Sequence, residues 1–166
     1  MQETVGGGRA KILITHRRPT RWLADGAPDP ESYVQVGDVE EVWNVITNAG
    51  RDFLHTQGYG AAGVANGLNF IALSNDTLTE TATSTVLSNE IVANGLSRAS
   101  GTVAHTTGTN TTTVDKTFTA TGSQSAQKAA LFTASSAGTM NHVLSFSQRA
   151  LISGDTLQCT FTITIG

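Results

Sequence analysis

The sequence predicts a mainly β protein: a β-sandwich or jelly-roll-like body with one helical segment and an extended N-terminal arm. Threonine occurs 26 times in 166 residues, and its branched Cβ favours the extended backbone of a strand. Short apolar or alternating runs follow one another between clusters of Gly, Asn and Ser, as expected of sandwich or barrel strands. The closing stretch, residues 154–166, alternates apolar residues with threonine or glutamine, which is the two-residue period of a strand buried on one face.

The first 37 residues are predicted to form the arm. They include Gly6, Gly7 and Gly8, a short strand-like run at residues 10–15, and all three prolines of the chain. Such a segment favours extended backbone and loops, so we expect it to lie outside the core. The remaining residues, 38–166, are expected to form a single domain, with a helix at residues 38–57 and a β-sandwich at residues 67–166.

The helix is predicted from a cap and an apolar stripe. Asp38 is a candidate N-cap, and Glu41 follows three residues later as in a capping box. Gly58 is a suitable terminator, and Gly50 could divide the helix in two. Apolar residues recur at three- and four-residue steps; they are Val39, Val42, Trp43, Ile46, Ala49, Phe53 and Leu54.

Six strands are predicted in the second half of the chain from its short apolar or alternating runs. They lie near residues 68–74, 96–106, 112–121, 128–134, 142–148 and 157–165. Threonine takes every second position from Thr77 to Thr85, which fits either an edge strand or an extended loop.

The charge is unevenly placed along the chain. Residues 1–21 hold five bases against one acid, a net charge of +4, whereas the remaining residues hold five bases and twelve acids, a net charge of −7. A basic arm on an acidic body suggests binding to an acidic partner surface, including that of a neighbouring copy. Trp and Arg also dominate the energetics of interfaces. The predicted partner-binding residues are Arg9, Lys11, Arg17, Arg18, Arg21 and Trp22.

No motif in the sequence predicts a catalytic, cofactor or metal site. The G-x-G-x-x-G match at residues 58–63 follows a predicted helix and precedes a strand, the reverse of a dinucleotide-binding turn, so we interpret it as a linker. The four histidines have no spaced partners that suggest zinc, and the lone Cys159 lies on the apolar face of the last strand. We therefore expect a protein that is not an enzyme.

Membrane and nucleic-acid partners are also not expected. No stretch approaches the length of a membrane span, and the N-terminus has no uninterrupted apolar segment of a signal peptide. The stretch at residues 9–22 could grip phosphates, but the body is acidic and contains no aromatic-rich strand platform.

The threonine face of the last strand is expected to be an assembly surface. Monomeric proteins usually cover an outer sheet face with Lys and Glu, whose charges discourage association. Threonine lacks that repulsion, so a nearly uncharged β surface suits contact with neighbouring subunits. A hydroxyl-rich exterior with good strand propensity is the simpler alternative.

Five pieces of sequence occur in the order IALSND, GLSRASGTVAH, KTFTATG, KAALFTA and GDTLQCTFTITIG. In this order the stretch from residue 67 to residue 166 resembles small structural proteins of tailed bacteriophage virions. The resemblance implies a β-sandwich or jelly-roll module on a capsid, tail or fibre, oligomeric and without catalysis. It does not extend clearly to residues 1–37.

The function expected from the resemblance is that of a virion structural protein, assembled in the host cytoplasm. We expect a capsid decoration or cement subunit that attaches through its N-terminal arm to the major capsid protein or a tail protein, and that contacts copies of itself as a homo-oligomer. The alternative is a tail or tail-fibre module that binds host glycans.

Overall fold

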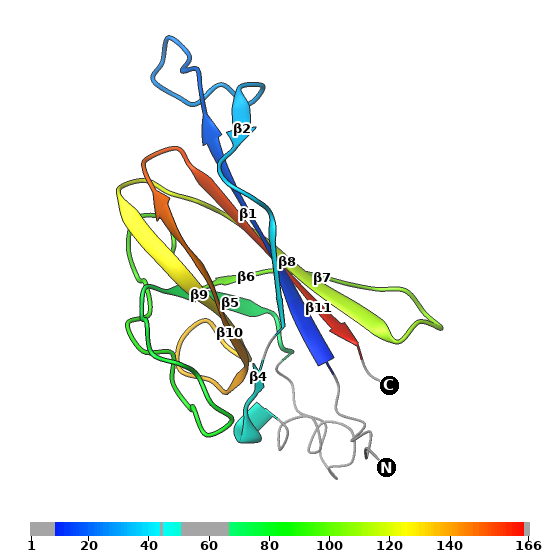
Figure 1. The fold of residues 1–166 in the computed structure, drawn as a ribbon. Coiled ribbons are helices and arrows are strands. Elements are labelled where there is room, and N and C mark those ends of the chain that lie inside the picture. Colours follow the sequence, from blue (N-terminus) through cyan, green and yellow to red (C-terminus); the bar gives the residue numbers. More distant parts are fainter. Residues whose placement is uncertain (1–8, 44, 51–66, 165–166) are drawn as a thin grey trace.

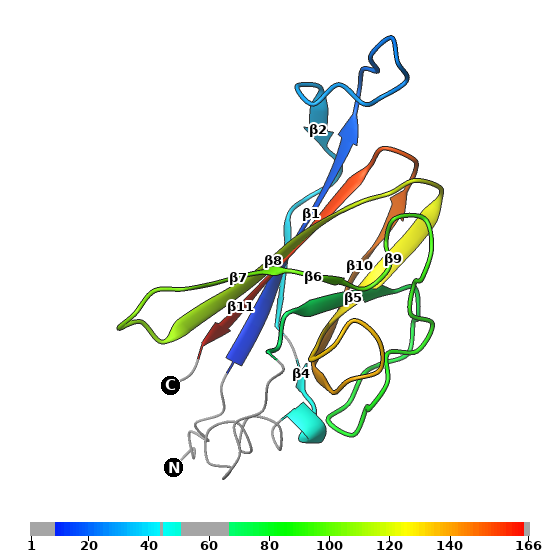
Figure 2. The same ribbon diagram turned by 180° about the vertical axis from the view of Figure 1, so that it is seen from behind.

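The protein is a sandwich of two antiparallel β-sheets (Figure 1, and from behind in Figure 2). This computed structural model describes residues 9–43, 45–50 and 67–164. One sheet has six strands, in the order β2-β1-β11-β8-β7 with β3 also paired to β1, and the other has five, in the order β4-β10-β9-β5-β6. The predicted β-sandwich is confirmed.

The strands have the following bounds: β1 Arg9–Pro19, β2 Tyr33–Gln35, β3 Glu40–Trp43, β4 Val45–Ile46, β5 Phe70–Ser74, β6 Ala99–Ser100, β7 Thr102–His105, β8 Thr111–Thr119, β9 Gln124–Phe132, β10 Met140–Leu151 and β11 Thr156–Thr164. Each of the six runs predicted after residue 67 contains at least part of a strand. Residues 77–85 contain no strand and form loop and turns. Of the two structures that fit the threonine alternation, an edge strand or an extended loop, the loop is the one observed.

The closing strand has the buried face that its alternation predicts. On β11, the side chains of Leu157, Cys159 and Phe161 are fully buried between the sheets, and burial raises the pKa of the Cys159 thiol. β11 lies between β1 and β8, with nine residue pairs to each. It is therefore a central strand of the six-stranded sheet, and Cys159 is a core residue.

The predicted arm is wrong for residues 9–19, because they form β1, which is also a central strand. β1 is eleven residues long, and it pairs with β11 on one side and with β2 and β3 on the other. Ile12 and Ile14 on its inner face are fully buried in the core between the sheets. The flanking prolines and glycines concealed a strand whose apolar face completes the core.

The predicted helix at residues 38–57 is also wrong over residues 40–43 and 45–46, which form β3 and β4. Residues 48–50 are helical, and residues 51–57 lie outside the described residues. The two residues expected to cap the helix, Asp38 and Glu41, instead bond to residues of the sheets. The backbone carbonyl of Asp38 accepts a hydrogen bond from Arg149, and Glu41 pairs with Lys11 of β1 at 2.8 Å.

The two lateral edges of the sandwich are formed by segments that change sheet. β3 pairs with β1 in the six-stranded sheet, and β4, two residues further on, pairs with β10 in the five-stranded sheet. On the other edge, β6 pairs with β5, and β7 pairs with β8 of the opposite sheet. A Cβ on Gly101, between β6 and β7, would lie 2.8 Å from the carbonyl oxygen of Asp115, so this crossing requires glycine.

Residues 75–98 cover part of the outer face of the five-stranded sheet, where Leu87 packs with Ala130 and Phe132. Ile91 and Leu96 of the same segment enter the core between the sheets. Lys128 of β9 is buried beneath this segment and donates hydrogen bonds to Asp76 at 2.9 Å, to Glu80 at 2.8 Å and to the carbonyl of Leu78. Burial alone would lower the pKa of Lys128, but the two carboxylates outweigh it and raise that pKa. The three acceptors match the three N–H groups of the ammonium.

A second contact fastens the same covering segment. Arg98 forms an ion pair with Glu90, and its guanidinium lies 3.6 Å from the ring centroid of Phe132 on β9. This cation–π contact and the Lys128 cluster hold the segment at two separate points of the sheet. The six-stranded sheet has no such covering segment among the described residues.

The burial of Ile14 generates a prediction about β1. Ile14→Ala should lower the free energy of unfolding by about 2–5 kcal/mol, because it leaves a cavity between the sheets. Leu13→Ala, one residue away on the exposed outer face, should cost less than about 1 kcal/mol. Urea unfolding of both variants tests whether β1 is a core strand, and equal effects would contradict the assignment.

His142 generates a prediction about pH. Its ring is buried in β10, neither ring nitrogen has a hydrogen-bond partner in the described part of the chain, and burial lowers its pKa from 6.5 to about 4. Between these pH values His142 is protonated in the unfolded chain and neutral in the folded one. The free energy of unfolding is therefore highest above pH 6.5 and falls as the pH drops towards 4. The loss should reach at most about 3 kcal/mol.

Urea unfolding at a series of pH values measures this dependence. His142→Leu should flatten it over that range, whereas His105→Gln, at an exposed position, should leave it unchanged. Asp76 and Asp155 have pKa values lowered from 3.8, so their contributions are lost only below that pH. A wild-type protein equally stable at both ends of the range would contradict the prediction.

Candidate protein-binding site

A loop extends beyond both sheets at one end of the sandwich, where β1 ends and β2 begins (Figure 1). We call residues 20–32 the pole loop. It exists because β1 continues to Pro19, where it pairs with Tyr33 at the start of β2. The described ends of the chain, Arg9 and Thr164, pair with each other at the opposite end of β1. Among residues 9–37, the pole loop is thus the part that projects from the body.

The pole loop is held in one conformation by its own hydrogen bonds. The Oγ1 of Thr20 donates to the carbonyl of Ser32 at 2.8 Å, which closes the neck of the loop. Arg21 and Asp29 form an ion pair at 2.9 Å further out, and Trp22 and Pro28 form a β-bridge. Backbone N–H groups of Thr20, Leu23, Gly26, Asp29 and Ser32 donate to carbonyls within the loop. The loop is therefore preorganised.

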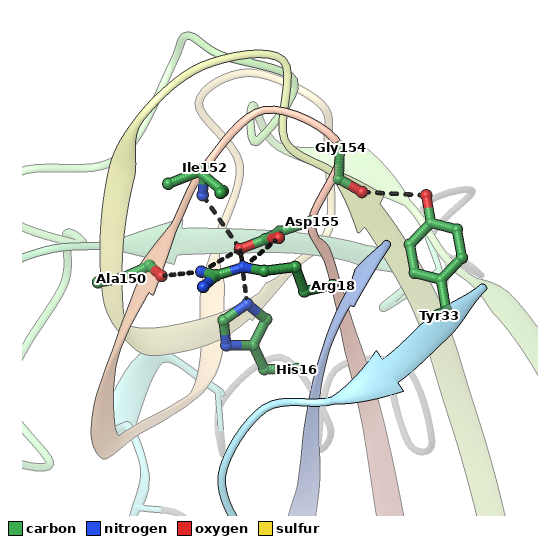
Figure 3. A network of polar contacts seen from close by, with 7 residues as sticks. All are labelled: His16, Arg18, Tyr33, Ala150, Ile152, Gly154 and Asp155. Carbon is green, nitrogen blue, oxygen red and sulfur yellow. Dashed lines mark hydrogen bonds and ion pairs between the residues drawn. The ribbon is translucent and has the colours of Figure 1, made fainter. Parts of the chain in front are cut away.

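Asp155 anchors the base of the loop to the turn between β10 and β11 (Figure 3). Its carboxylate is fully buried and accepts hydrogen bonds from Arg18 Nε and Nη2, each at 2.9 Å, and from the backbone N–H of Ile152 at 3.1 Å. The Nε2 of His16 lies 2.9 Å from the same carboxylate. Beside this network, Tyr33 donates to the carbonyl of Gly154 at 3.0 Å.

The environment of Asp155 keeps it ionised. Burial alone would raise its pKa, but hydrogen bonds from Arg18, His16 and the N–H of Ile152 outweigh burial and hold that pKa below 3.8. The bond to Asp155 also raises the pKa of Arg18. Two guanidinium N–H groups, a ring nitrogen and a backbone N–H use the acceptor capacity of the carboxylate. This His–Asp pair therefore serves to fasten β1 to the turn.

Large apolar side chains lie exposed at this end of the molecule. Trp22 and Leu23 in the pole loop are 51% and 47% exposed, and Ile152 in the adjacent turn is 46% exposed. The Trp22 ring lies against the turn: a Cβ on Gly154, whose φ is +90°, would be 2.8 Å from the ring. We call Trp22, Leu23 and Ile152 the pole patch. A rigid Trp with its edge supported and its face open is typical of an interface anchor.

The pole loop is acidic, in contrast to the basic arm that the sequence predicted. It holds one base, Arg21, against three acids, Asp25, Asp29 and Glu31, a net charge of −2. Asp29 is paired with Arg21, whereas Asp25 and Glu31 are exposed. A protein surface complementary to this loop would combine an apolar recess with basic side chains.

The six predicted partner-binding residues do not form one surface. Lys11 pairs with Glu41, Arg18 with Asp155 and Arg21 with Asp29. Arg17 is exposed on the outer face of the sheet, and Arg9 begins β1 at its far end. Lys11 and Arg17 are about 20 Å apart along the strand. Arg21 and Trp22 are both exposed in the projecting loop, but Arg21 is paired with Asp29, so three of the five predicted bases bind carboxylates of the same chain.

The sequence analysis missed Asp155, Tyr33, Leu23 and Ile152. Asp155 resembled the other acids near predicted turns, and its only distinguishing mark is that it precedes the strand that pairs with β1. Its partners His16 and Arg18 are 139 and 137 residues away, a separation that no local pattern reveals. Leu23 and Ile152 became candidates only through their exposure.

The covering segment contains a second candidate for a binding site. A shallow hollow of about 330 Å³ is lined by Asp76, Glu80 and hydroxyl side chains of the covering segment, but both carboxylates bind Lys128. Within residues 9–43, 45–50 and 67–164, no three His, Cys, Asp or Glu side chains gather as a metal site. Over the same ranges, no helix has the length and apolar character needed to cross a membrane.

Comparison with protein-family models, with curated proteins and with solved structures finds no match.

The Asp155 network generates a stability prediction. Asp155→Ala should lower the free energy of unfolding by about 1–3 kcal/mol, because it leaves the buried His16 ring and the N–H of Ile152 without their acceptor. It should also free the pole loop, so that trypsin cleaves after Arg21 faster than in the wild type. Asp25→Ala, whose carboxylate accepts only the N–H of Ala27 within the described residues, is the matched control. Unchanged stability and unchanged cleavage of the Asp155 variant would contradict the role of the network.

Proposed function

We propose that this protein is a virion structural protein that acts by binding other proteins, as a capsid decoration or cement subunit. The observation that carries the proposal is the pole loop, a rigid projection that presents Trp22 and Leu23 half exposed beside Ile152 of the adjacent turn. The order of the sequence pieces from residue 67 to residue 166, which resembles structural proteins of phage virions, supports the same function.

Attachment occurs through the pole patch in place of a flexible basic arm. A loop already ordered before binding loses little conformational entropy when it docks, so more of the contact energy appears as affinity. Trp22 would enter an apolar recess on the shell protein, and Asp25 and Glu31 would face basic residues at its rim. The partner is the major capsid protein or a tail protein, and the protein acts on it by binding alone.

The alternative is a tail or tail-fibre module that binds host glycans, and one observation favours it. Trp43 is 60% exposed on the outer face of the six-stranded sheet, where it pairs with Lys11. Partly exposed threonines of β11 and β8 follow on the same face. An open aromatic ring beside hydroxyl groups could stack on a sugar.

The test of the proposed function uses virions prepared without this protein, with the purified chain added back. Wild-type protein should cosediment with the particles in a fixed, high copy number. Trp22→Ala should weaken binding about 30-fold, the effect of losing about 2 kcal/mol at an interface anchor. Quantitative mass spectrometry of the sedimented particles gives the copy number and the affinity.

Val92→Ala is the control, since Val92 is a more exposed apolar residue outside the pole patch; it should bind as the wild type does. Failure of the wild-type chain to bind particles would contradict the proposed function. Binding that Trp22→Ala leaves intact would remove the pole patch from the mechanism. Glycan binding that Trp43→Ala abolishes would favour the alternative.

A further inference from the structure

The edge of the six-stranded sheet at β7 lacks the features that usually prevent strand pairing. Within the described ranges β7 pairs with β8 alone, and all four of its residues are exposed. None of them is Lys, Glu, Asp, Arg or Pro, the residues that commonly block an edge. In an antiparallel pair, alternate residues direct their N–H and C=O groups away from the partner strand. β7 therefore presents unpaired backbone groups along an uncharged edge.

The other edge strands in the described part of the chain are protected or shorter. β3, at the opposite edge of the same sheet, carries Glu40 and Glu41, and both of these form ion pairs. β2 has three residues, and β4 and β6 have two each. The uncharged four-residue edge of β7 is thus a particular feature of this molecule.

Val103 gives a second, independent sign that this edge is covered in the assembled protein. It pairs across the sheet with Val114, so both side chains are on the inner face, yet Val103 is 52% exposed and Val114 only 1%. The chain leaves the opposite sheet at β6 and crosses at Gly101. The hairpin of β7 and β8 then extends away from the five-stranded sheet in both views (Figures 1 and 2). Val103 is left at the margin of the core without full cover.

We propose that β7 pairs with β7 of a second copy of this chain, in an antiparallel arrangement that joins the two six-stranded sheets. A two-fold axis places identical edges antiparallel without any further adjustment. In this arrangement each β7 faces an identical β7, so charged side chains on this strand would face charges of the same sign on the partner. Residues 99–114 contain no Lys, Arg, Asp or Glu, which makes self-pairing possible here. The two Val103 side chains would cover each other.

This contact is separate from the pole patch and adds to the proposed function. The pole loop lies at the end of β1 where Pro19 pairs with β2, whereas β7 pairs with β8 on the other side of β11. A subunit could therefore hold its shell partner by the pole loop and a neighbouring copy by β7. Pairing of two four-residue edges buries less surface than a stable dimer needs. The dimer should therefore be weak and form only at high protein concentration.

Sedimentation velocity over a series of concentrations, up to about 1 mM, tests the proposal. The wild-type chain should shift from monomer to dimer. Val103→Lys should raise the concentration needed for the dimer at least about tenfold, because two buried charges would meet across the axis. Ala104→Lys, on the other face of the same strand, should act in the same direction. The matched control is Val92→Lys, an exposed position in the covering segment.

Cross-linking gives a readout of the contact itself. Cys159 is the only cysteine and is buried, so Val103→Cys supplies a single accessible thiol. Mild oxidation should convert this variant to a covalent dimer, and Val92→Cys should remain monomeric. Circular dichroism and thermal unfolding verify that each variant is folded before it is scored.

The outcomes decide the proposal. A dimer that both β7 lysine variants dissociate and that the control preserves supports it. A wild-type chain that remains monomeric throughout, an oligomer that survives both variants, or one that Val92→Lys disrupts equally would overturn it. The β7 variants should still bind particles through Trp22, and Trp22→Ala should still dimerise, so failure of this inference is distinct from failure of the proposed function.

Discussion

The pairing of β1 with β11 is the constraint on which the rest of the structure depends. It joins the two ends of the described chain through nine residue pairs in the middle of one sheet and brings Ile12 and Ile14 beside Leu157, Cys159 and Phe161 in one core. Because β1 lies beside β11, His16 and Arg18 reach Asp155 at the turn before β11. That network fixes the direction in which the chain leaves the sheet, and so places the pole loop.

The two outer faces of the sandwich differ in how far other segments of the chain cover them. The five-stranded sheet is partly covered by its own segment, which Lys128 and Arg98 fasten through ion pairs. The threonine-rich face of the six-stranded sheet has no such cover among the described residues, and one of its edges carries no charge. The two outer faces of the sandwich therefore differ in how much of their surface the chain itself covers.

Charge has a different role from the one that the sequence suggested. The bases near the N-terminus form a local excess when they are counted along the chain, but Lys11, Arg18 and Arg21 each meet a carboxylate in the fold. What projects is acidic and carries Trp22 and Leu23. A net charge over a segment therefore did not identify a binding surface, because folding paired three of its five bases with carboxylates of the same chain.

The β class, the strands after residue 67 and the buried face of β11 could be predicted from sequence, since alternation and β-branched residues act within a few neighbours. The same local rules failed for residues 40–43 and 45–46, where an apolar spacing that suits a helix is used by two strands of opposite sheets. They also failed for β1, whose partner is more than a hundred residues away. Local pattern determined which stretches are extended and which side chains are apolar. Only the tertiary structure decided which strands are central, which charges are paired and which apolar residues remain exposed, because these depend on contacts between distant parts of the chain.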